Sequence, residues 1–415
     1  MARQFNVPVF YQSPIISRVK EARRVMDPRK RDLAPSVLDF GPVRFKIARH
    51  FGFCYGVENA IEIAYKVVAD NDERRRVFLL SEIIHNPLVN ADLQSRGVRF
   101  LRESTGEQII PYSELMPNDL VIVPAFGTSI ETQEALRERG IDPYRYDTTC
   151  PFVEKVWNKS RQIGLRSYTV VVHGKRFHEE TRATFSHAKE GAPVVVVLDL
   201  EEAADLARVI RGEWGAAEFN AGFADHCSEG FDPARDLVRI GVVNQTTMLA
   251  SETKAIADLL RSAMVDRYGE TDIDDHFADT SDTLCYATNE NQSATLALIA
   301  SGGDLAIVVG GHNSSNTSHL VELCGEKMPT YFLSDETEIL SQDRIRHFDL
   351  HTRAMRISED WLPEVQVRPL DILLTAGASC PDSLLDRVMQ RVVRWFPDAR
   401  QVDEVLEAFE LQAAT

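Results

Sequence analysis

The sequence lacks the features of a membrane or secreted protein. No apolar run approaches the roughly 18 residues that a membrane-spanning helix needs. No basic segment followed by an apolar one opens the chain, as it would in a signal peptide. The six cysteines are spread along 415 residues, which argues against a disulfide-stapled scaffold and for a reducing compartment. We therefore expect a cytoplasmic protein that has no membrane partner.

The chain also lacks the excess of basic residues that binding to a phosphate backbone rewards. It carries 46 Lys and Arg against 63 Asp and Glu, a net charge of −17, so we expect no nucleic-acid partner. Residues 1–50 are the exception, because they hold a basic excess. We interpret them as an extension that packs on the domains rather than as a transit peptide, because they are poor in Ser and contain Asp27, Asp32 and Asp39.

Strand-like and helix-like patterns alternate along the chain. Continuous β-branched runs are typical of strands that are covered on both faces of a parallel sheet. Such runs lie at residues 121–123, 169–172, 194–198, 240–243, 305–309 and 372–374. Residues 57–70 show helical spacing of apolar side chains, and residues 296–300 and 384–396 belong to further helices. This alternation predicts an α/β fold.

The length suggests about two to three domains. Residues 211–236 have several Gly and no periodicity, so we expect a surface insertion there. The strongly acidic residues 266–282 are expected to form an exposed connection. We divide the chain into an N-terminal extension (1–45), three α/β domains (46–135, 136–265 and 266–400) and a C-terminal tail (401–415).

Four small polar loops each follow a strand run and precede a predicted helix. They lie at residues 124–129, 244–247, 310–318 and 375–379. In α/β folds such loops lie at the carboxyl edge of the sheet, where ligands bind. Free N–H groups at a helix start suit an anion such as phosphate. Helix capping uses the same residue types, but four such loops, one with Asn313-Ser-Ser-Asn316, favour an anionic ligand.

Two cysteines end the same tetrapeptide, Asp147-Thr-Thr-Cys150 and Asp282-Thr-Leu-Cys285, and Cys54 lies within Gly52-Phe-Cys-Tyr-Gly56. Each precedes a predicted helix, and a thiolate at a helix N-terminus is primed to bind metal. No compact Cys-x-x-Cys is present, which disfavours a zinc knuckle. Three thiolates could instead hold an iron–sulfur cluster with one iron left without a protein ligand. The remaining cysteines are interpreted as buried small apolar residues: Cys227, Cys324 and Cys380.

Histidines and a carboxyl group follow other elements. His85 follows the Glu82 turn, and the segment from His173 to Glu180 follows a strand run. A histidine that binds charge and a carboxyl that delivers a proton would suit a reaction that expels hydroxide. The alternative for the second segment is a solvated loop with incidental charges. His178 and Glu180 are two apart, so we expect them to point the same way in an extended loop.

Together these residues resemble one family, the 4-hydroxy-3-methylbut-2-enyl diphosphate reductases, in its longer plant and cyanobacterial branch. The resemblance spans roughly residues 47–385. It rests on ordered motifs: Gly52-Phe-Cys-Tyr-Gly-Val57, His85-Asn-Pro-Leu-Val-Asn90, Asp147-Thr-Thr-Cys-Pro151, His178-Glu-Glu180, Gln245-Thr-Thr247, Asp282-Thr-Leu-Cys285, Gly310-Gly-His-Asn-Ser-Ser-Asn316 and Thr375-Ala-Gly-Ala-Ser379.

The resemblance implies a trefoil of three α/β domains around a central 4Fe-4S cluster held by Cys54, Cys150 and Cys285. The substrate is then an allylic diphosphate, whose hydroxyl binds the open iron. Two electrons and two protons remove water and give isopentenyl and dimethylallyl diphosphate. The resemblance also implies a ferredoxin or flavodoxin as the electron donor. It assigns the proton relay to Glu180 beside Thr246, and the diphosphate contacts to His85, His178, Ser314, Ser315, Asn316 and Ser379.

The chain departs from the family pattern at Phe126, where many members carry a histidine that binds diphosphate. Lys175 or Arg176 could compensate for that contact. Cys380, directly after Ser379, is a second departure, because its thiolate, if it bound the cluster, would occupy the iron that has no protein ligand.

Two other functions stay open on the residues alone. A three-cysteine dehydratase of the quinolinate synthase type binds carboxylates, so arginines should converge on its site, whereas these loops are rich in Ser, Thr, Asn and His. A non-catalytic iron–sulfur sensor would need no Glu180 and would usually bind DNA, which the net charge disfavours.

Overall fold

The structure is a computed structural model that describes residues 5–71, 74–278, 283–363 and 368–413. It has a mixed α/β fold with several largely parallel sheets, as the alternation of strand and helix patterns predicts. The chain forms two compact units. Unit 1 comprises Met1–Glu58, His85–Leu88 and Tyr286–Thr415, and unit 2 comprises Asn59–Ile84 and Val89–Cys285. Within the described ranges, no helix combines the length and the apolar character that crossing a bilayer requires.

The sheet of unit 1 has the strand order β1-β2-β14-β10-β11, in which β1 is antiparallel to β2 and the other neighbours are parallel. Its strands are β1 (Ser36–Asp39), β2 (Val43–Ile47), β14 (Leu370–Ala376), β10 (Leu305–Val309) and β11 (Thr330–Leu333). The central strands β14 and β10 are buried along their whole length. That burial explains why β10 and residues 372–374 of β14 are continuously apolar rather than alternating.

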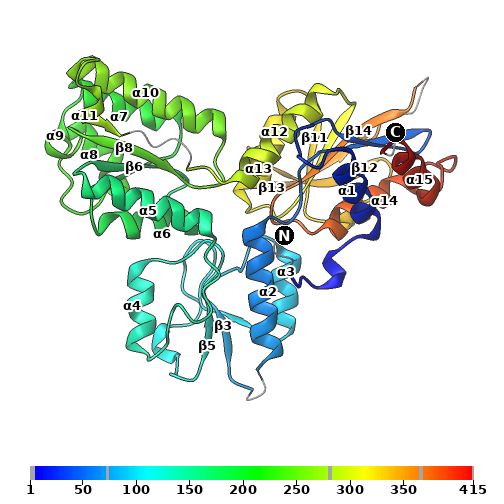
Figure 1. Ribbon diagram of the computed structural model, residues 1–415, viewed down its shortest axis with the longest axis horizontal. Helices are drawn as coiled ribbons and strands as arrows, with labels where there is room; N and C mark the ends of the chain where they lie inside the picture. The colour runs from blue at the N-terminus through cyan, green and yellow to red at the C-terminus, as the bar shows by residue number, and fades with distance from the viewer. Residues whose placement is uncertain (1–4, 72–73, 279–282, 364–367, 414–415) are drawn as a thin grey trace. The chain divides into compact units, whose positions relative to one another are not determined.

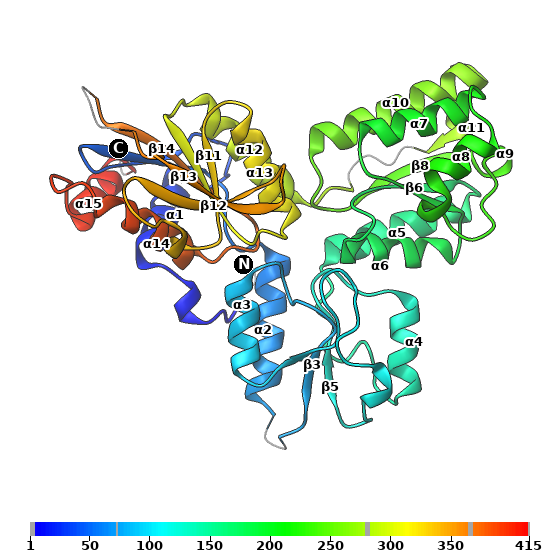
Figure 2. The ribbon, with the colours of Figure 1, turned by 180° about the vertical axis from the view of Figure 1, so that it is seen from behind.

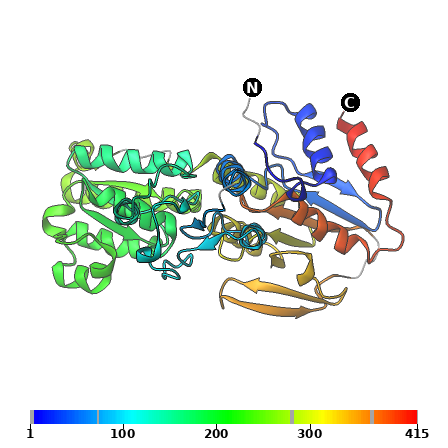
Figure 3. The ribbon, with the colours of Figure 1, turned by 90° about the horizontal axis from the view of Figure 1, so that it is seen from below.

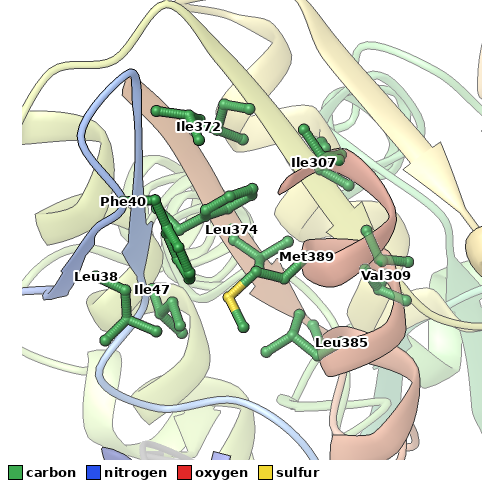
Figure 4. Packing of buried hydrophobic residues seen from close by; sticks show 14 of the residues in the cluster. Leu38, Phe40, Ile47, Ile307, Val309, Ile372, Leu374, Leu385 and Met389 are labelled. Carbon is green, nitrogen blue, oxygen red and sulfur yellow. The ribbon is translucent and has the colours of Figure 1, made fainter. Parts of the chain in front are cut away.

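Helices cover both faces of this sheet. Ile372 and Leu374 of β14 belong to the core on one face, together with residues of α1 (Pro14–Met26), α14 (Asp382–Val393) and α15 (Val402–Ala413). Figure 4 shows Leu385 and Met389 of α14 packed in this core beside Leu374. Leu373, between them in sequence, belongs to the opposite core with residues of α12 (Tyr286–Ala300) and α13 (Ser315–Gly325).

The two terminal helices of the chain pack together, and Figure 3 shows α1 beside α15. Arg18 of α1 forms a bidentate ion pair with Glu410 of α15, with nitrogen–oxygen distances of 2.7 and 2.8 Å. A short 3-10 helix, η1 (Val9–Tyr11), precedes α1. The N-terminal residues therefore supply both a helix and two strands to the core of unit 1.

A hairpin of β12 (Arg344–Asp349) and β13 (Ala354–Glu359) lies beside β11, as Figure 2 shows. It follows a further 3-10 helix, η4 (Glu336–Glu338).

Unit 2 contains two parallel sheets. The smaller has the order β4-β3-β5, formed by β4 (Arg99–Phe100), β3 (Val77–Leu79) and β5 (Leu120–Ile122). The helical elements associated with this part of the chain are α2 (Tyr55–Ala69), α3 (Pro87–Ser95), η2 (Tyr112–Glu114) and α4 (Ile130–Glu138). The larger sheet has the order β7-β6-β8-β9, formed by β7 (Val194–Val197), β6 (Thr169–His173), β8 (Ile240–Asn244) and β9 (Phe277–Ala278).

Figure 1 shows the larger sheet of unit 2 between two helical layers, with α7 (Leu200–Arg211) and α10 (Ala250–Tyr268) on one face. On the other face lie α5 (Pro151–Leu165) and α6 (Glu179–Lys189). Val171 of β6 packs in the first layer and Val170 and Val172 in the second. This arrangement places the ends of β6 and β8, and the starts of the helices that follow them, at one edge of the sheet.

The structure differs from the sequence-based expectation in two connecting regions. Residues 211–236 are not irregular, because they contain α8 (Ala216–Phe223), η3 (Ala224–His226) and α9 (Pro233–Asp236). Phe219 and Phe223 of α8 are buried, so apolar packing holds this region. The acidic residues 266–282 are not only a connection, because α11 (Ile273–His276) and β9 lie within them. Residues 279–282, including Asp282 of the repeated tetrapeptide, lie outside the described residues.

Candidate functional site

The candidate residues fall into two groups, one in each unit. Unit 2 contains Cys150, His178, Glu180, Thr246 and Cys285. Unit 1 contains Cys54, His85, Ser314, Ser315, Asn316 and Ser379.

In unit 2 the carboxylate of Glu180 is bound to Thr246 by two hydrogen bonds. The Thr246 N–H donates to Oε1 at 2.5 Å, and the Thr246 hydroxyl donates to Oε2 at 3.0 Å. Glu180 lies in the first turn of α6, after β6, and Thr246 follows β8, so neighbouring parallel strands bring them to one sheet edge. Glu180 is 1 % exposed. A carboxyl group held this way, beside a hydroxyl that can exchange a proton with it, is suited to acid–base chemistry.

Gln245 holds the two strand ends in register. Its side-chain oxygen accepts hydrogen bonds from the Lys175 N–H at 3.1 Å and the Thr181 hydroxyl at 3.0 Å, and its amide donates to Thr247 at 2.7 Å. A Cβ atom on Gly174 would lie 2.7 Å from the Thr181 hydroxyl oxygen, so this close approach requires glycine. Gln245 therefore fixes the loop that carries Thr246 to the loop that leads to Glu180.

The two cysteines of unit 2 lie beside this carboxylate. Cys150 is the N-cap residue of α5, and Cys285 directly precedes α12 and donates its N–H to the Thr246 carbonyl at 3.4 Å. Burial raises the pKa of the Cys150 thiol to about 11, and the charges of Cys285 and Glu180 add to that increase. Without a neighbouring cation this thiol stays protonated at neutral pH.

The repeated Asp-Thr-x-Cys pattern has a local role at its first occurrence. The Asp147 carboxylate accepts from the N–H and the hydroxyl of Thr149, at 2.8 and 2.5 Å, which folds the turn before Cys150. At the second occurrence the Thr283 hydroxyl donates to the Asn244 side chain at the end of β8. The sequence placed Asn244 in the polar loop 244–247 but did not predict this bond, because an asparagine at a strand end has no signal that points to a partner 39 residues away.

His178 is the N-cap residue of α6, and not part of an extended loop with Glu180 as the sequence spacing predicts. Its Nδ1 accepts the Glu180 N–H at 3.2 Å, so the neutral ring carries its proton on Nε2. The Phe126 ring packs edge-on against this imidazole, with ring centroids 5.6 Å apart. The residue that departs from the family pattern thus contacts a predicted diphosphate ligand, whereas the Arg176 guanidinium lies over the ring of Phe177.

In unit 1, two loops that leave adjacent parallel strands come together. Asn316 in the first turn of α13 accepts the Ala378 N–H at 2.8 Å through Oδ1, which joins the loop after β10 to the loop after β14. The Asn316 amide nitrogen is buried and has no hydrogen-bond partner among the residues that the structure describes. A buried donor of this kind is a group that a ligand or an ordered water satisfies. Asn291 of α12, which sequence analysis missed, also contacts Asn316, at 3.5 Å.

Ser314 and Ser315 lie at the start of α13 and are both buried. Ser314 caps the helix: its hydroxyl oxygen accepts the Thr317 N–H at 3.3 Å and the Thr317 hydroxyl at 3.0 Å. Helix capping is therefore part of the function of this serine in the fold. The N–H groups of the same turn form a site that favours anions.

His85 joins the same pair of loops through its backbone and its ring. Its carbonyl accepts the Ser379 hydroxyl at 3.0 Å, and its Nδ1 lies 3.3 Å from the Asn313 side-chain nitrogen. A Cβ atom on Gly311 would lie 2.4 Å from the His85 carbonyl, so the loop passes this segment as closely as glycine allows. The structure therefore brings together all the diphosphate-binding candidates of unit 1.

Gly377 makes a testable contribution to this arrangement, because a Cβ atom there would lie 2.0 Å from the Thr317 hydroxyl oxygen. We expect Gly377→Ala to lower the free energy of unfolding by about 1–3 kcal/mol, since the start of α13 must move. Gly325→Ala, at the last residue of the same helix, is the matched control, because nothing lies within 4 Å of its Cβ position. Urea unfolding of both variants tests this, and equal stability would contradict the close packing.

Cys54 directly precedes α2 and donates its N–H to the Ala378 carbonyl at 3.2 Å. One residue of the Ser379 loop, Ala378, thus contacts both Asn316 and Cys54. The remaining cysteines differ: Cys324 and Cys380 are fully buried in the two cores of unit 1, and burial raises the pKa of the Cys324 thiol to about 12. Cys227 is half-buried against the Ala224 carbonyl. No group of three or more His, Cys, Asp or Glu side chains gathers at metal-binding distance within the described ranges.

Comparisons with known proteins identify the family. The family model described as LytB protein matches residues 45–393. A 4-hydroxy-3-methylbut-2-enyl diphosphate reductase of Thermosynechococcus vestitus is 41% identical over 353 residues, which is 85% of each chain. The enzyme of that name from Crocosphaera subtropica is 37% identical over 92% of this chain and 89% of its own. The resemblance found in the sequence motifs is thereby confirmed.

Solved structures share the fold. The E-1-hydroxy-2-methyl-but-2-enyl-4-diphosphate reductase of Plasmodium falciparum covers 83% of this chain and 86% of its own, with a TM-score of 0.59 and 20% identity. A second reductase, described as the terminal enzyme of the non-mevalonate pathway, covers 84% of this chain and 99% of its own, with a TM-score of 0.50 and 25% identity. The chain belongs to the LytB family, the 4-hydroxy-3-methylbut-2-enyl diphosphate reductases.

Proposed function

We propose that this chain converts 4-hydroxy-3-methylbut-2-enyl diphosphate into isopentenyl and dimethylallyl diphosphate, the last step of the non-mevalonate pathway. The reaction adds two electrons and two protons to the allylic alcohol and releases its hydroxyl as water. The observation that carries the residue assignment is the buried Glu180–Thr246 pair, which lies in one unit with Cys150 and Cys285. A ferredoxin or flavodoxin is the proposed electron donor.

We propose Cys54, Cys150 and Cys285 as the ligands of a 4Fe-4S cluster that keeps one iron without a protein ligand, at the centre of a trefoil fold. The chemistry of these cysteines supports the assignment. Each stands directly before a helix and is only partly buried. When bound, such a cluster supplies electrons and a Lewis-acidic iron.

The unit 1 loops are proposed to bind the diphosphate group of the substrate. Ser314, Ser315 and Asn316 offer backbone N–H groups, hydroxyls and an amide at the start of α13. Ser379 and His85 adjoin them through the bond between the serine hydroxyl and the histidine carbonyl. Neutral donors at a helix start suit phosphate oxygens, whereas a quinolinate synthase-type site would use arginines for its carboxylates. The proposal assigns the Nε2–H of His178, in unit 2, to the same anion.

Glu180 is proposed to deliver the proton that converts the leaving hydroxide into water. Hydroxide is a poor leaving group, so an acid must lie within reach of the oxygen of the leaving hydroxyl. The Thr246 hydroxyl, bonded to Glu180, would then contact the substrate hydroxyl and transmit the proton. The Thr246 N–H fixes the other carboxylate oxygen, which keeps the acid in one orientation without cost at the moment of reaction.

We expect Ser314→Ala and Asn316→Asp to raise KM for the diphosphate substrate. Losing a hydrogen bond to a charged group costs about 1.5–3 kcal/mol. The aspartate keeps an oxygen for the Ala378 N–H but replaces the amide donor with a negative charge, which repels the diphosphate. The effect of Asn316→Asp on KM should therefore exceed that of Ser314→Ala. Ser301→Ala, which removes a hydroxyl at the end of α12, is the control. If all three variants kept wild-type KM, these residues would serve helix capping and packing only.

An anaerobic assay with reduced methyl viologen tests the proposed function. We expect the allylic diphosphate to be consumed and both isomeric diphosphate products to form. Failure of the cluster-loaded protein to turn over this substrate would contradict the proposal and favour a dehydratase of carboxylate substrates or a sensor. The two alternatives differ in the same assay, because a sensor would show reversible reduction of the cluster and no turnover of either substrate class.

A further inference from the structure

The N-terminal segment, residues 5–27, lies before the part of the chain that the family model matches. It contacts the short stretch that carries Cys54. Three aromatic residues alternate with Gly52 and Cys54, and each touches the N-terminal segment. Lys20 Nζ lies 4.6 Å from the centroid of the Phe51 ring. The ring centroids of Tyr11 and Phe53 are 5.9 Å apart, and those of Phe5 and Tyr55 are 5.0 Å apart.

Lys20 also forms an ion pair beside Gly52 of this stretch. Its Nζ lies 2.8 and 2.9 Å from the two carboxylate oxygens of Asp382, the first residue of α14. Gly52 leaves the room for this pair, because a Cβ atom there would lie 2.6 Å from Asp382 Oδ1 and 3.3 Å from Lys20 Nζ. The φ angle of Gly52 is +81°, which favours glycine for a second reason.

The same ion pair also involves the segment that follows Ala378, the residue to which the Cys54 N–H is hydrogen-bonded. The Cys54 N–H donates to the Ala378 carbonyl, and Asp382 begins α14 four residues after Ala378. Lys20 therefore connects α1 both to the stretch that carries the cysteine and to the helix start after the loop that the cysteine contacts. The Ser13 hydroxyl adds a second link between α1 and α14, because it donates to Asp386 at 2.7 Å.

We propose that the N-terminal segment is a positioning element for Cys54, with the Lys20–Asp382 ion pair as its main anchor. The consequence for the cluster rests on the proposed role of Cys54 as a ligand. Groups that orient a metal ligand contribute to metal retention although they do not touch the metal. Lys20 and Asp382 also place opposite charges beside Gly52, two residues before the cysteine, and nearby charge affects the reduction potential of an iron–sulfur cluster.

Lys20→Met tests the proposal, with Arg18→Met as the matched control. Both residues lie on α1 and both form ion pairs, and their side chains are 40% and 35% exposed. Arg18 pairs with α15 instead of α14. We expect amide exchange at Cys54 to become several-fold faster in Lys20→Met and to stay unchanged in Arg18→Met. We expect iron loss to a chelator to rise by about 10-fold in Lys20→Met only, and Lys20→Arg to restore both.

Asp382→Asn breaks the same pair from the other side. Both variants should speed amide exchange at Cys54, but they should shift the cluster potential in opposite directions. Loss of the Lys20 cation should make it more negative, and loss of the Asp382 anion should make it more positive. Potential shifts in the same direction in both variants would contradict the charge argument. An unspecific loosening of the segment would not depend on the sign of the charge that was removed.

The proposal is overturned if Lys20→Met matches Arg18→Met in both amide exchange and iron loss. Faster exchange with unchanged iron retention would also overturn the link to the cluster. Cys54→Ser separates this inference from the proposed function. If that variant kept the whole cluster, the ligand assignment would fail, whereas exchange at the Cys54 amide would still show whether Lys20 positions the segment.

Discussion

Glutamine in place of Glu180 is expected to leave a protein that keeps its cluster and binds substrate, with turnover lower by about 10²–10⁴-fold. The amide preserves the size of the side chain and can still accept from the Thr246 N–H, but it cannot donate an acidic proton. The fall should therefore appear in kcat, with little change in KM. Single-turnover rates with the reduced enzyme, measured beside the iron content, test this expectation.

Glu179→Gln is the control for this prediction. Glu179 is also buried in the first turn of α6, but its charge acts on Arg182, one helical turn further on. The control should lose some stability, because Arg182 loses an opposite charge, while kcat per folded molecule stays near wild type. A dead Glu179→Gln beside an active Glu180→Gln would move the proton relay to the neighbouring residue. If both stayed active, the acid would lie elsewhere, as on the diphosphate of the substrate.

Single Ser substitutions at Cys54, Cys150 and Cys285 are expected to abolish the brown chromophore. A serine hydroxyl is not ionised at neutral pH and is a poor ligand for iron, so each variant should lose the cluster. Iron and acid-labile sulfide analysis, with the visible absorption spectrum, measures the loss.

The other cysteines serve as controls and call for different replacements. Cys227→Ser suits a half-buried position, but Cys324 and Cys380 lie in apolar cores, where a buried hydroxyl would itself cost stability. Cys324→Ala and Cys380→Ala avoid that cost. The ligand assignment is wrong if any of these three variants bleaches the protein as fully as Cys54→Ser does.

The sequence predicted the parts of the fold that depend on local pattern. The buried run at residues 305–309 became β10 over those same residues, because five consecutive apolar side chains suit a strand covered on both faces. Strands β1 and β2 were missed, because only continuous apolar runs were interpreted as strands, although the alternation of apolar and basic residues in β2 is typical of a strand with one buried face. Their role depends on distant partners: Arg44 and Lys46 form ion pairs with Asp371 on β14, at 2.6 and 3.1 Å. No pattern within residues 43–47 reveals those partners.

The same distinction applies to the candidate site. Motifs pointed to Glu180 and Thr246, and the structure places them in direct contact although 66 residues separate them. Supporting residues carried no such signal. Asn244 and Asn291 have one side-chain partner each in this region, far away in sequence, and the contact of Lys20 with Asp382 spans 362 residues. Long-range polar pairs of this kind are set by the packing of helices and strands, which single-sequence patterns do not encode.

Anaerobic Mössbauer spectroscopy of protein enriched in ⁵⁷Fe tests the proposed cluster, because it distinguishes an iron without a cysteine ligand from the others in the cluster. We predict one iron site that differs from the other three in the free protein and changes when the allylic diphosphate is added. In Cys54→Ser, that spectrum should be absent. A cluster whose irons are all equivalent, and whose spectrum does not respond to the substrate, would contradict the account.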